Sequence, residues 1–364
     1  MKIRENVPLS ELTTMRLGGP AKYVIDIEKL DDIAPAFDFV AEKNLPFYIL
    51  GGGANTIAKD DGFNGVIIRN TMTGIRDVVP GERVTALEGD PQLSFAKMGE
   101  DKGRQDPLPS GPVRITALGG TDWDTVVAYT TERGLTGIEA LSKIPGTAGA
   151  APVQNIGAYG QELADTFLSA EVYDIKNKSF KTLQKSDFGF SYRRSILNST
   201  KKGQYFVISI TLELKPGTMS RPFYNSIERY IDEHHCTDFS PAGIRDIVST
   251  IRSDKLPDPA KKASAGSFFK NIYLTKDEAK TAESKNIPVY HGHDGLKINS
   301  GWLIEQCGLK GKLLHGIRVC DAAALVLINE SAASYDDLAA ARTEIIKSVH
   351  DKFGYQLEQE PNEI

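Results

Sequence analysis

The stretch AKYVIDIEKLDDIAPAFDFVAEKNLPFYILGGGAN, residues 21–55, decides the fold. Its apolar pattern predicts a strand over 21–27, an amphipathic helix over 30–44 and a short strand over 46–50. The helix carries Ile33, Phe37 and Val40 on one face, and GVIIRN at 65–70 predicts another strand. Strands that alternate with helices indicate a layered α/β or α+β architecture.

The glycines that end this stretch are the first candidate site. GGGAN at 51–55 follows an apolar strand, and glycine lets backbone N–H groups approach a ligand closely. Successive N–H groups in such a turn can bind a phosphate. An ordinary strand-to-loop turn is the alternative interpretation. The segment is not the GxGxxG fingerprint, so a Rossmann domain is not expected.

A second glycine-rich stretch, IPGTAGAAPVQNIGAYGQE, occupies residues 144–162. Its composition favours neither a helix nor a strand. Such a segment can press backbone donors and acceptors against a flat, polar ligand edge. A structural loop between domains is an equally good interpretation of the residues alone.

Two later segments carry polar groups suited to chemistry. FGFSYRRSILN at 188–198 places Arg193 beside Arg194, and a buried arginine needs an anion because it stays charged. Only one of the two would face a site if the segment were a strand. ASAGSFFKN at 263–271 offers Ser267, which could deliver a proton or simply lie at a strand edge.

The remaining pattern predicts mixed helices and strands. Helices are expected over 123–134, over 241–252 and from Ser334 to Gly354. Strands are expected at 170–175, 205–214, 324–329 and 355–358, and the strand at 205–214 alternates as if half-buried. LKPGT near 217 marks a candidate boundary.

Composition excludes several classes of protein. With 364 residues the chain is long enough for two or three domains, and its net charge of −5 gives no basic field for nucleic acid. No apolar run could span a membrane, and no signal peptide is expected. His234, His235 and Cys236 lack metal-ligand spacing, so we expect no metal. The three cysteines form no CxxC pair and fit a reducing cytoplasm.

Together these segments resemble the UDP-N-acetylenolpyruvoylglucosamine reductase family. The resemblance follows family order and covers most of the chain. It is carried by TTMRLGGPAKY, ILGGGAN, GLTGIEALSKIPGTAGAAPVQNIGAYGQE, FSYRRS, KLPDP, AGSFFKN, GWLIEQCGLKG and LVLINE.

The resemblance implies an α+β chain with a two-lobed FAD-binding fold of the vanillyl-alcohol-oxidase type and a smaller substrate-binding domain. Lobe 1 would comprise residues 1–73 and 353–364, lobe 2 residues 74–217, and the substrate domain residues 218–352. FAD would bind without a covalent bond. Its implied contacts are Gly51, Gly52, Gly53, Ala54, Asn55, Pro145, Gly146, Gly149, Ala150, Gln154, Asn155 and Gly157.

The resemblance also implies a reaction in two halves. NADPH reduces FAD, and flavin N5 then passes a hydride to the enolpyruvyl group of the UDP-sugar, giving UDP-N-acetylmuramate for peptidoglycan synthesis. Arg193 would hold the carboxylate, Glu360 would add a hydrogen bond, and Ser267 would supply the proton. The implied substrate contacts are Tyr224, Lys255, Asn271 and Gln306. A cytoplasmic monomer is expected.

Three features depart from the family pattern. The stretch between about 89 and 124 is longer than usual, which suggests an inserted surface hairpin. Arg194 stands where aspartate is common, and Asn362 replaces an arginine often found two residues beyond Glu360. A flavin-dependent oxidase and a catalytically silent flavoprotein are the alternative functions. An oxidase of this group often tethers FAD through His or Cys, which neither glycine-rich segment offers.

Overall fold

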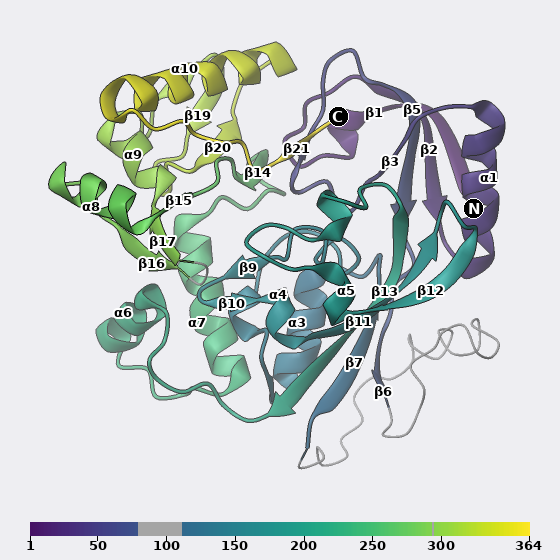
Figure 1. Cartoon of the computed structure of the whole chain (residues 1–364), viewed down its shortest axis with the longest axis horizontal. Helices are drawn as coiled ribbons and strands as arrows, with labels where there is room; N and C mark the ends of the chain where they lie inside the picture. Colours follow the sequence, from purple (N-terminus) through teal and green to yellow (C-terminus); the bar gives the residue numbers. More distant parts are fainter. Residues whose placement is uncertain (79–110, 293–294) are drawn as a thin grey trace. The chain divides into compact units, whose positions relative to one another are not determined.

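The computed structural model describes residues 1–78, 111–292 and 295–364 (Figure 1). They form two compact units. Unit 1 comprises residues 1–5, 23–51 and 65–251, and unit 2 comprises residues 6–22, 52–64 and 252–364. The predicted three-region division stays a prediction, and most of the long segment expected near 89–124 lies outside the described residues.

The first sheet contains the two strands that were predicted within residues 21–55. Its order is β1-β2-β5-β3, and β3 and β5 are parallel. The bounds are β1 (Lys2–Pro8), β2 (Pro20–Ile27), β5 (Phe63–Asn70) and β3 (Phe47–Ile49). Helix α1 (Ile33–Lys43) buries Ile33, Phe37 and Val40 in the same apolar cluster as the sheet. These predictions are confirmed, although the helix starts at Ile33 because Leu30–Asp32 forms a 3-10 turn.

The largest sheet of unit 1 is antiparallel and has the order β12-β11-β13-β7-β6, with β8 also on β13. The bounds are β6 (Ile75–Val78), β7 (Val113–Leu118), β8 (Leu135–Thr136), β11 (Phe167–Asp174), β12 (Ser179–Gln184) and β13 (Tyr205–Pro216).

Strand β13 is buried over most of its length, not half-buried as its alternating pattern suggested. Phe206 and Ile208 join the apolar cluster of α1, whereas Val207, Ile210 and Leu212 join a second cluster. The strand therefore separates two cores, and both of its faces are covered.

Helix α3 (Trp123–Glu132) contributes Trp123, Val126 and Val127 to that second cluster. The shorter elements of unit 1 are β9 (Gly157–Ala158), β10 (Gln161–Glu162), α4 (Leu163–Thr166) and α5 (Lys185–Phe188). Helices α6 (Asn225–His234) and α7 (Pro241–Lys255) form their own apolar cluster, and α7 belongs to unit 1 as far as Ile251.

Unit 2 is built on two small antiparallel sheets, of order β14-β20-β19-β18 and β15-β17-β16 (Figure 1). The strands are β14 (Ser264–Ser267), β15 (Ile272–Leu274), β16 (Tyr290–Gly292), β17 (Gly295–Ile298), β18 (Leu313–Leu314), β19 (Ile317–Val319) and β20 (Val326–Asn329). The helices are α8 (Lys276–Ser284), α9 (Ser300–Gln306) and α10 (Tyr335–Phe353).

The end of the chain departs from the sequence expectation. No strand forms at 355–358. Instead β21 (Asn362–Glu363) pairs in parallel with β4 (Thr56–Ile57). Helix α10 agrees with its predicted limits, because Ser334 accepts a bond from the Asp337 N–H and Gly354 is left-handed.

Helix α10 gives a test of the packing in unit 2. Replacing the fully buried Ile345 by alanine should lower the free energy of unfolding by about 2–5 kcal/mol, through lost burial and a cavity. Lys347→Ala on the same helix removes only an exposed i,i+4 pair with Asp351, worth about 0.2–0.5 kcal/mol. Urea denaturation followed by circular dichroism measures both, and equal losses would contradict the packing.

Candidate active site

The GGGAN loop has the backbone geometry of an anion site. Gly53 is buried and left-handed, with φ of +67°, and a Cβ there would stand 2.0 Å from the Leu12 carbonyl oxygen. Within the described part of the chain, the N–H groups of Gly52, Gly53 and Ala54 donate to no protein acceptor. Successive N–H groups without partners suit a phosphate, and the phosphate site at this loop stays a prediction.

Thr14 connects this loop to the strand that ends in Ser267. The Thr14 N–H donates to the Gly53 carbonyl at 3.1 Å, and the Ser264 N–H donates to the Thr14 carbonyl at 3.0 Å. The Thr14 hydroxyl donates to the Ser264 carbonyl at 2.6 Å. This role of Thr14, which lies in TTMRLGGPAKY, gives no signal in the sequence, because Ser264 is 250 positions away.

The segment 144–162 lies directly on another loop of unit 1. Ala148 and Gly149 donate their N–H groups to the carbonyls of Thr121 and Gly119 at 2.8 and 2.9 Å. A Cβ on Gly149 would stand 3.0 Å from the Gly119 Cα. A side chain at Gly149 would thus crowd this close backbone contact. Gly146, with φ of +130°, faces open space instead.

Asn155 holds this segment in shape. Its side chain is buried, donates to the Glu162 carboxylate at 2.8 Å and accepts from the Ala164 N–H at 2.9 Å. The predicted contact residues Pro145, Ala150, Gln154 and Gly157 are all at least partly exposed. The polar side chain of Asn155 thus stabilises the loop, while its neighbours remain accessible.

Arg193 is brought to this same segment. Its guanidinium donates to the Gly157 carbonyl at 3.1 Å and lies over the Tyr192 ring, 5.0 Å from its centroid. The residue is half-buried and Arg194 is exposed. The segment is not a strand here, since Arg193 sits in a turn with φ of +52° that Ser191 and Arg194 close by hydrogen bonds.

Ser267 and Glu360 both belong to unit 2, where the backbone of Glu360 is bonded to the residue after Ser267. Ser267 ends β14 and is half-buried, and the next two residues, Phe268 and Phe269, are completely buried in the core of unit 2. The Glu360 N–H donates to the Phe268 carbonyl at 2.9 Å. Residues 268–270 and 358–360 are thereby bonded side by side. Arg193, the third predicted catalytic residue, belongs to unit 1.

Arg342 on α10 supports the segment that carries Glu360. Its Nη1 donates to Gln359 at 2.6 Å and to Glu363 at 3.1 Å. The Tyr335 hydroxyl donates to Glu363 at 2.6 Å. Burial raises the pKa of Glu363, but hydrogen bonds from Tyr335, Lys59 and Arg342 outweigh it and lower that pKa. Local support for Glu360 thus comes from α10, where the sequence had suggested that a missing arginine weakened it.

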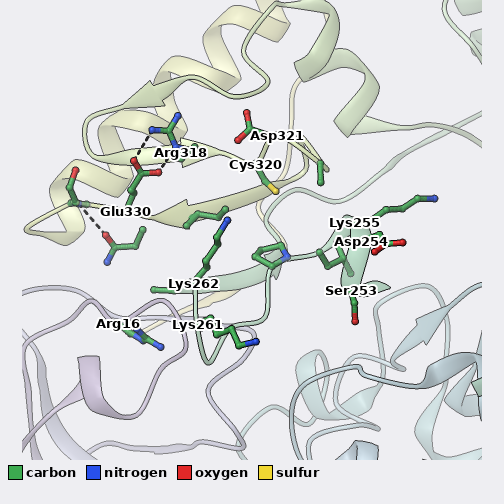
Figure 2. A pocket seen from close by; sticks show the side chains of 18 residues that line it. Arg16, Ser253, Asp254, Lys255, Lys261, Lys262, Arg318, Cys320, Asp321 and Glu330 are labelled. Carbon is green, nitrogen blue, oxygen red and sulfur yellow. Dashed lines mark hydrogen bonds and ion pairs between the residues drawn. The ribbon is translucent and has the colours of Figure 1, made fainter. Parts of the chain in front are cut away.

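Lys255 lines a cavity of about 750 Å³ within unit 2 (Figure 2). The wall carries five cationic and three anionic side chains, and the cations are Arg16, Lys255, Lys261, Lys262 and Arg318. Only Arg318 forms an ion pair with a carboxylate in the described residues, that of Glu330. The wall therefore has positive charge to offer an anionic group.

The other predicted substrate contacts lie on different elements. Tyr224 is 48% exposed at the start of α6 and packs edge-on against Tyr159, with ring centroids 5.8 Å apart. Asn271 accepts the Ser300 N–H through its side chain, and Gln306 is the exposed last residue of α9.

Across residues 1–78, 111–292 and 295–364, no group of three His, Cys, Asp or Glu side chains could hold a metal ion. None of the helices in the same ranges combines the length and the apolar character required to cross a bilayer.

Comparison with known proteins agrees with this geometry. The family described as FAD binding domain matches residues 110–181, and the family described as UDP-N-acetylenolpyruvoylglucosamine reductase, C-terminal domain, matches residues 258–364. The reductase of Vibrio parahaemolyticus is 32% identical over 99% of this chain and 94% of its own length. That of Ralstonia nicotianae is 33% identical over 97% of each chain.

The chain belongs to the UDP-N-acetylenolpyruvoylglucosamine reductase family. The solved reductase of Thermus caldophilus has the same fold, with a TM-score of 0.60 over 100% of this chain and 99% of that chain at 21% identity. The predicted fold class and the predicted FAD cofactor are thereby confirmed. The unpartnered N–H groups of the GGGAN loop and the glycine-only contact at Gly149 fit such a cofactor.

Gly53 provides a test of the cofactor site in this reductase family member. Gly53→Ala would push a methyl group into the Leu12 carbonyl and strain a left-handed residue. The purified variant should retain less than about half of the wild-type flavin, because an altered loop loses the N–H geometry that an anion needs. The ratio of flavin to protein absorbance measures this. Gly111→Ala, where nothing lies within 4 Å, is the matched control, and equal flavin content in both variants would argue against the site.

Proposed function

We propose that this protein reduces the enolpyruvyl ether of UDP-N-acetylglucosamine to UDP-N-acetylmuramate with NADPH and FAD. One observation carries the proposal beyond family membership. The Thr14 hydrogen bonds join the unpartnered N–H groups of the GGGAN loop to the strand that ends in Ser267, within one compact unit. A loop suited to a cofactor phosphate and a candidate proton donor therefore share one rigid support.

Bound FAD supplies the hydride chemistry, since it can take a hydride from NADPH and give one from N5 to the terminal carbon of the enolpyruvyl group. The addition puts negative charge on the substrate carboxylate and its α-carbon. The roles of the chain are to hold that carboxylate, to stabilise the charge and to protonate the α-carbon.

Arg193 is the proposed anchor of the carboxylate. Its guanidinium cannot lose its proton and offers several donors in one plane. One Nη bond and the Tyr192 ring already fix its orientation, so little further ordering is needed when an anion binds. A fixed cation near developing negative charge is the arrangement that stabilises such a transition state.

Ser267 is the proposed proton donor and Glu360 the proposed second hydrogen-bond donor. Phe268 and Phe269 anchor the backbone just after Ser267, and the Phe268 carbonyl anchors Glu360. A glutamate donates a hydrogen bond only while it is protonated. Glu360 would therefore act in its neutral form or share a proton with the substrate.

The rest of the substrate would extend over neighbouring groups. Lys255 is proposed for a diphosphate, which both NADPH and the UDP-sugar carry, because the cavity that it lines has an excess of cations. Tyr224, Asn271 and Gln306 are proposed to line the site. We also propose that the protein acts as a monomer in the cytoplasm, in peptidoglycan precursor synthesis, and so contributes to cell shape and division.

Ser267→Ala separates the two half-reactions. Flavin reduction by NADPH should stay within about twofold of the wild-type rate, because no proton from Ser267 is needed. Reoxidation by the enolpyruvyl sugar nucleotide should slow by about 10²–10⁴-fold, the usual contribution of a positioned acid. Stopped-flow flavin absorbance follows both rates.

The control for this experiment is Ser284→Ala, which removes an exposed hydroxyl at the end of α8. It should leave both rates unchanged. Equal reoxidation rates in the Ser267 and Ser284 variants would refute the role of Ser267, whereas a wild-type protein that turns over neither ligand would refute the proposed function.

A further inference from the structure

The carboxylate of Asp124 on α3 binds cationic side chains from two different parts of unit 1. Asp124 accepts bonds from both Nη atoms of Arg245 on α7, at 2.6 and 2.9 Å. It also accepts the Lys143 N–H at 2.7 Å, and the Lys143 Nζ lies 2.8 Å away. We name these three residues the Asp124 cluster.

The Asp124 cluster is much less exposed than an ordinary surface pair. The side chains of Arg245 and Asp124 are 16% and 19% exposed, whereas the Arg114–Glu213 pair of the same unit is 48% and 37% exposed. Burial raises the pKa of Asp124, but hydrogen bonds from Arg245 and Lys143 lower it by more. Asp124 therefore stays ionised near neutral pH. Two parallel Arg–carboxylate bonds fix both distance and orientation.

The position of Lys143 indicates which part of the chain the Asp124 cluster holds in place. Lys143 directly precedes the segment 144–162 and is held in a left-handed conformation, with φ of +59°. Because Asp124 binds its backbone N–H as well as its ammonium group, the start of that segment is fixed to α3. Arg245 lies in the second turn of α7, the helix whose last residue is Lys255.

The far end of the same segment also touches helices α6 and α7. Tyr159 packs on their apolar cluster and stacks edge-on with Tyr224. Apolar contacts of this kind are not directional, so by themselves they allow a helix to slide or rotate. The Asp124 cluster supplies the directional contact that they lack.

We propose that Arg245 and Asp124 are positioning residues that fix helix α7 on Lys143, the residue directly before the segment 144–162, and that they thereby set the affinity for ligands carrying a diphosphate. The inference rests on the proposed function, because it takes the diphosphate of NADPH and of the UDP-sugar to be what Lys255 binds. Neither residue touches the reacting atoms. Their loss therefore displaces α7 without altering the chemistry.

The test is steady-state kinetics of the FAD-loaded full chain. Arg245→Ala should raise KM for both NADPH and the enolpyruvyl sugar nucleotide about tenfold and leave kcat within about twofold, because a small displacement of a binding group costs affinity. Arg245→Lys keeps one ionic contact and should recover about half of this effect on a logarithmic scale. Arg114→Ala removes the exposed pair and should change neither constant.

Asp124→Ala should change a second measurable property, the flavin content. It frees Lys143 as well as Arg245, so it should weaken FAD retention in addition to raising both KM values. Arg245→Ala leaves Lys143 on Asp124 and should keep the full flavin content. If the two variants behave identically in flavin content, the role assigned to Lys143 is wrong.

The outcomes also separate this inference from the proposed function. If the wild type turns over both ligands and Arg245→Ala leaves both KM values unchanged, the positioning role alone is overturned. A fall in kcat with unchanged KM, or a lower melting temperature as the only effect, overturns it too. If the wild type reduces no enolpyruvyl sugar nucleotide, the proposed function fails and the inference fails with it. Should Arg245→Ala not fold, Arg245→Lys carries the test, with an expected threefold rise in both KM values.

Discussion

Close contact of a glycine with a neighbouring segment is the constraint on which both glycine-rich segments depend. Gly53 lies on the Leu12 carbonyl, Gly149 lies on the Gly119 backbone, and a Cβ on Gly51 would stand 2.7 Å from that of Ala150. A side chain at any of these three places would push the contacting segments apart. The glycines therefore serve the close packing of the loops first, and the accessibility of their N–H groups follows from that packing.

The same constraint links cofactor binding to stability. The N–H groups of Gly52, Gly53 and Ala54 have no protein acceptor in the described residues. Of these three residues only Gly53 is buried, and a buried donor left unsatisfied costs about 1–3 kcal/mol, so an anion bound at its N–H relieves that cost. Any ligand that binds only the folded state stabilises it. FAD should thus act as part of the fold of the loop as well as in the chemistry.

Local signals in the sequence predicted local structure well. The first strand–helix–strand unit and helix α10 follow from apolar periodicity and from capping residues that act within a few positions, such as Ser334 and Gly354. The failures have non-local causes. Strand β13 is buried on both faces because two separate cores pack against it, which its alternation does not reveal. The 355–358 segment pairs with no strand in the described part of the chain. The family resemblance supplied the site residues, but neither it nor the local pattern identified Thr14, whose bonding partners are 39 and 250 positions away.

Glu360 illustrates how a fold can stabilise a reactive group on an irregular segment. Between Gly354 and β21 the chain has no helix or strand, only one isolated bridge between Gln359 and Phe269. Hydrogen bonds to neighbouring elements fix this segment instead. The Glu360 N–H donates to the Phe268 carbonyl, and Arg342 donates to the Gln359 side chain. Arg342 is itself half-buried, at the edge of the helix face that packs Leu338, Ala341 and Ile345 into the core. The position of the segment that carries Glu360 therefore depends on the packing of α10, because Arg342 on this helix binds the residues on both sides of Glu360.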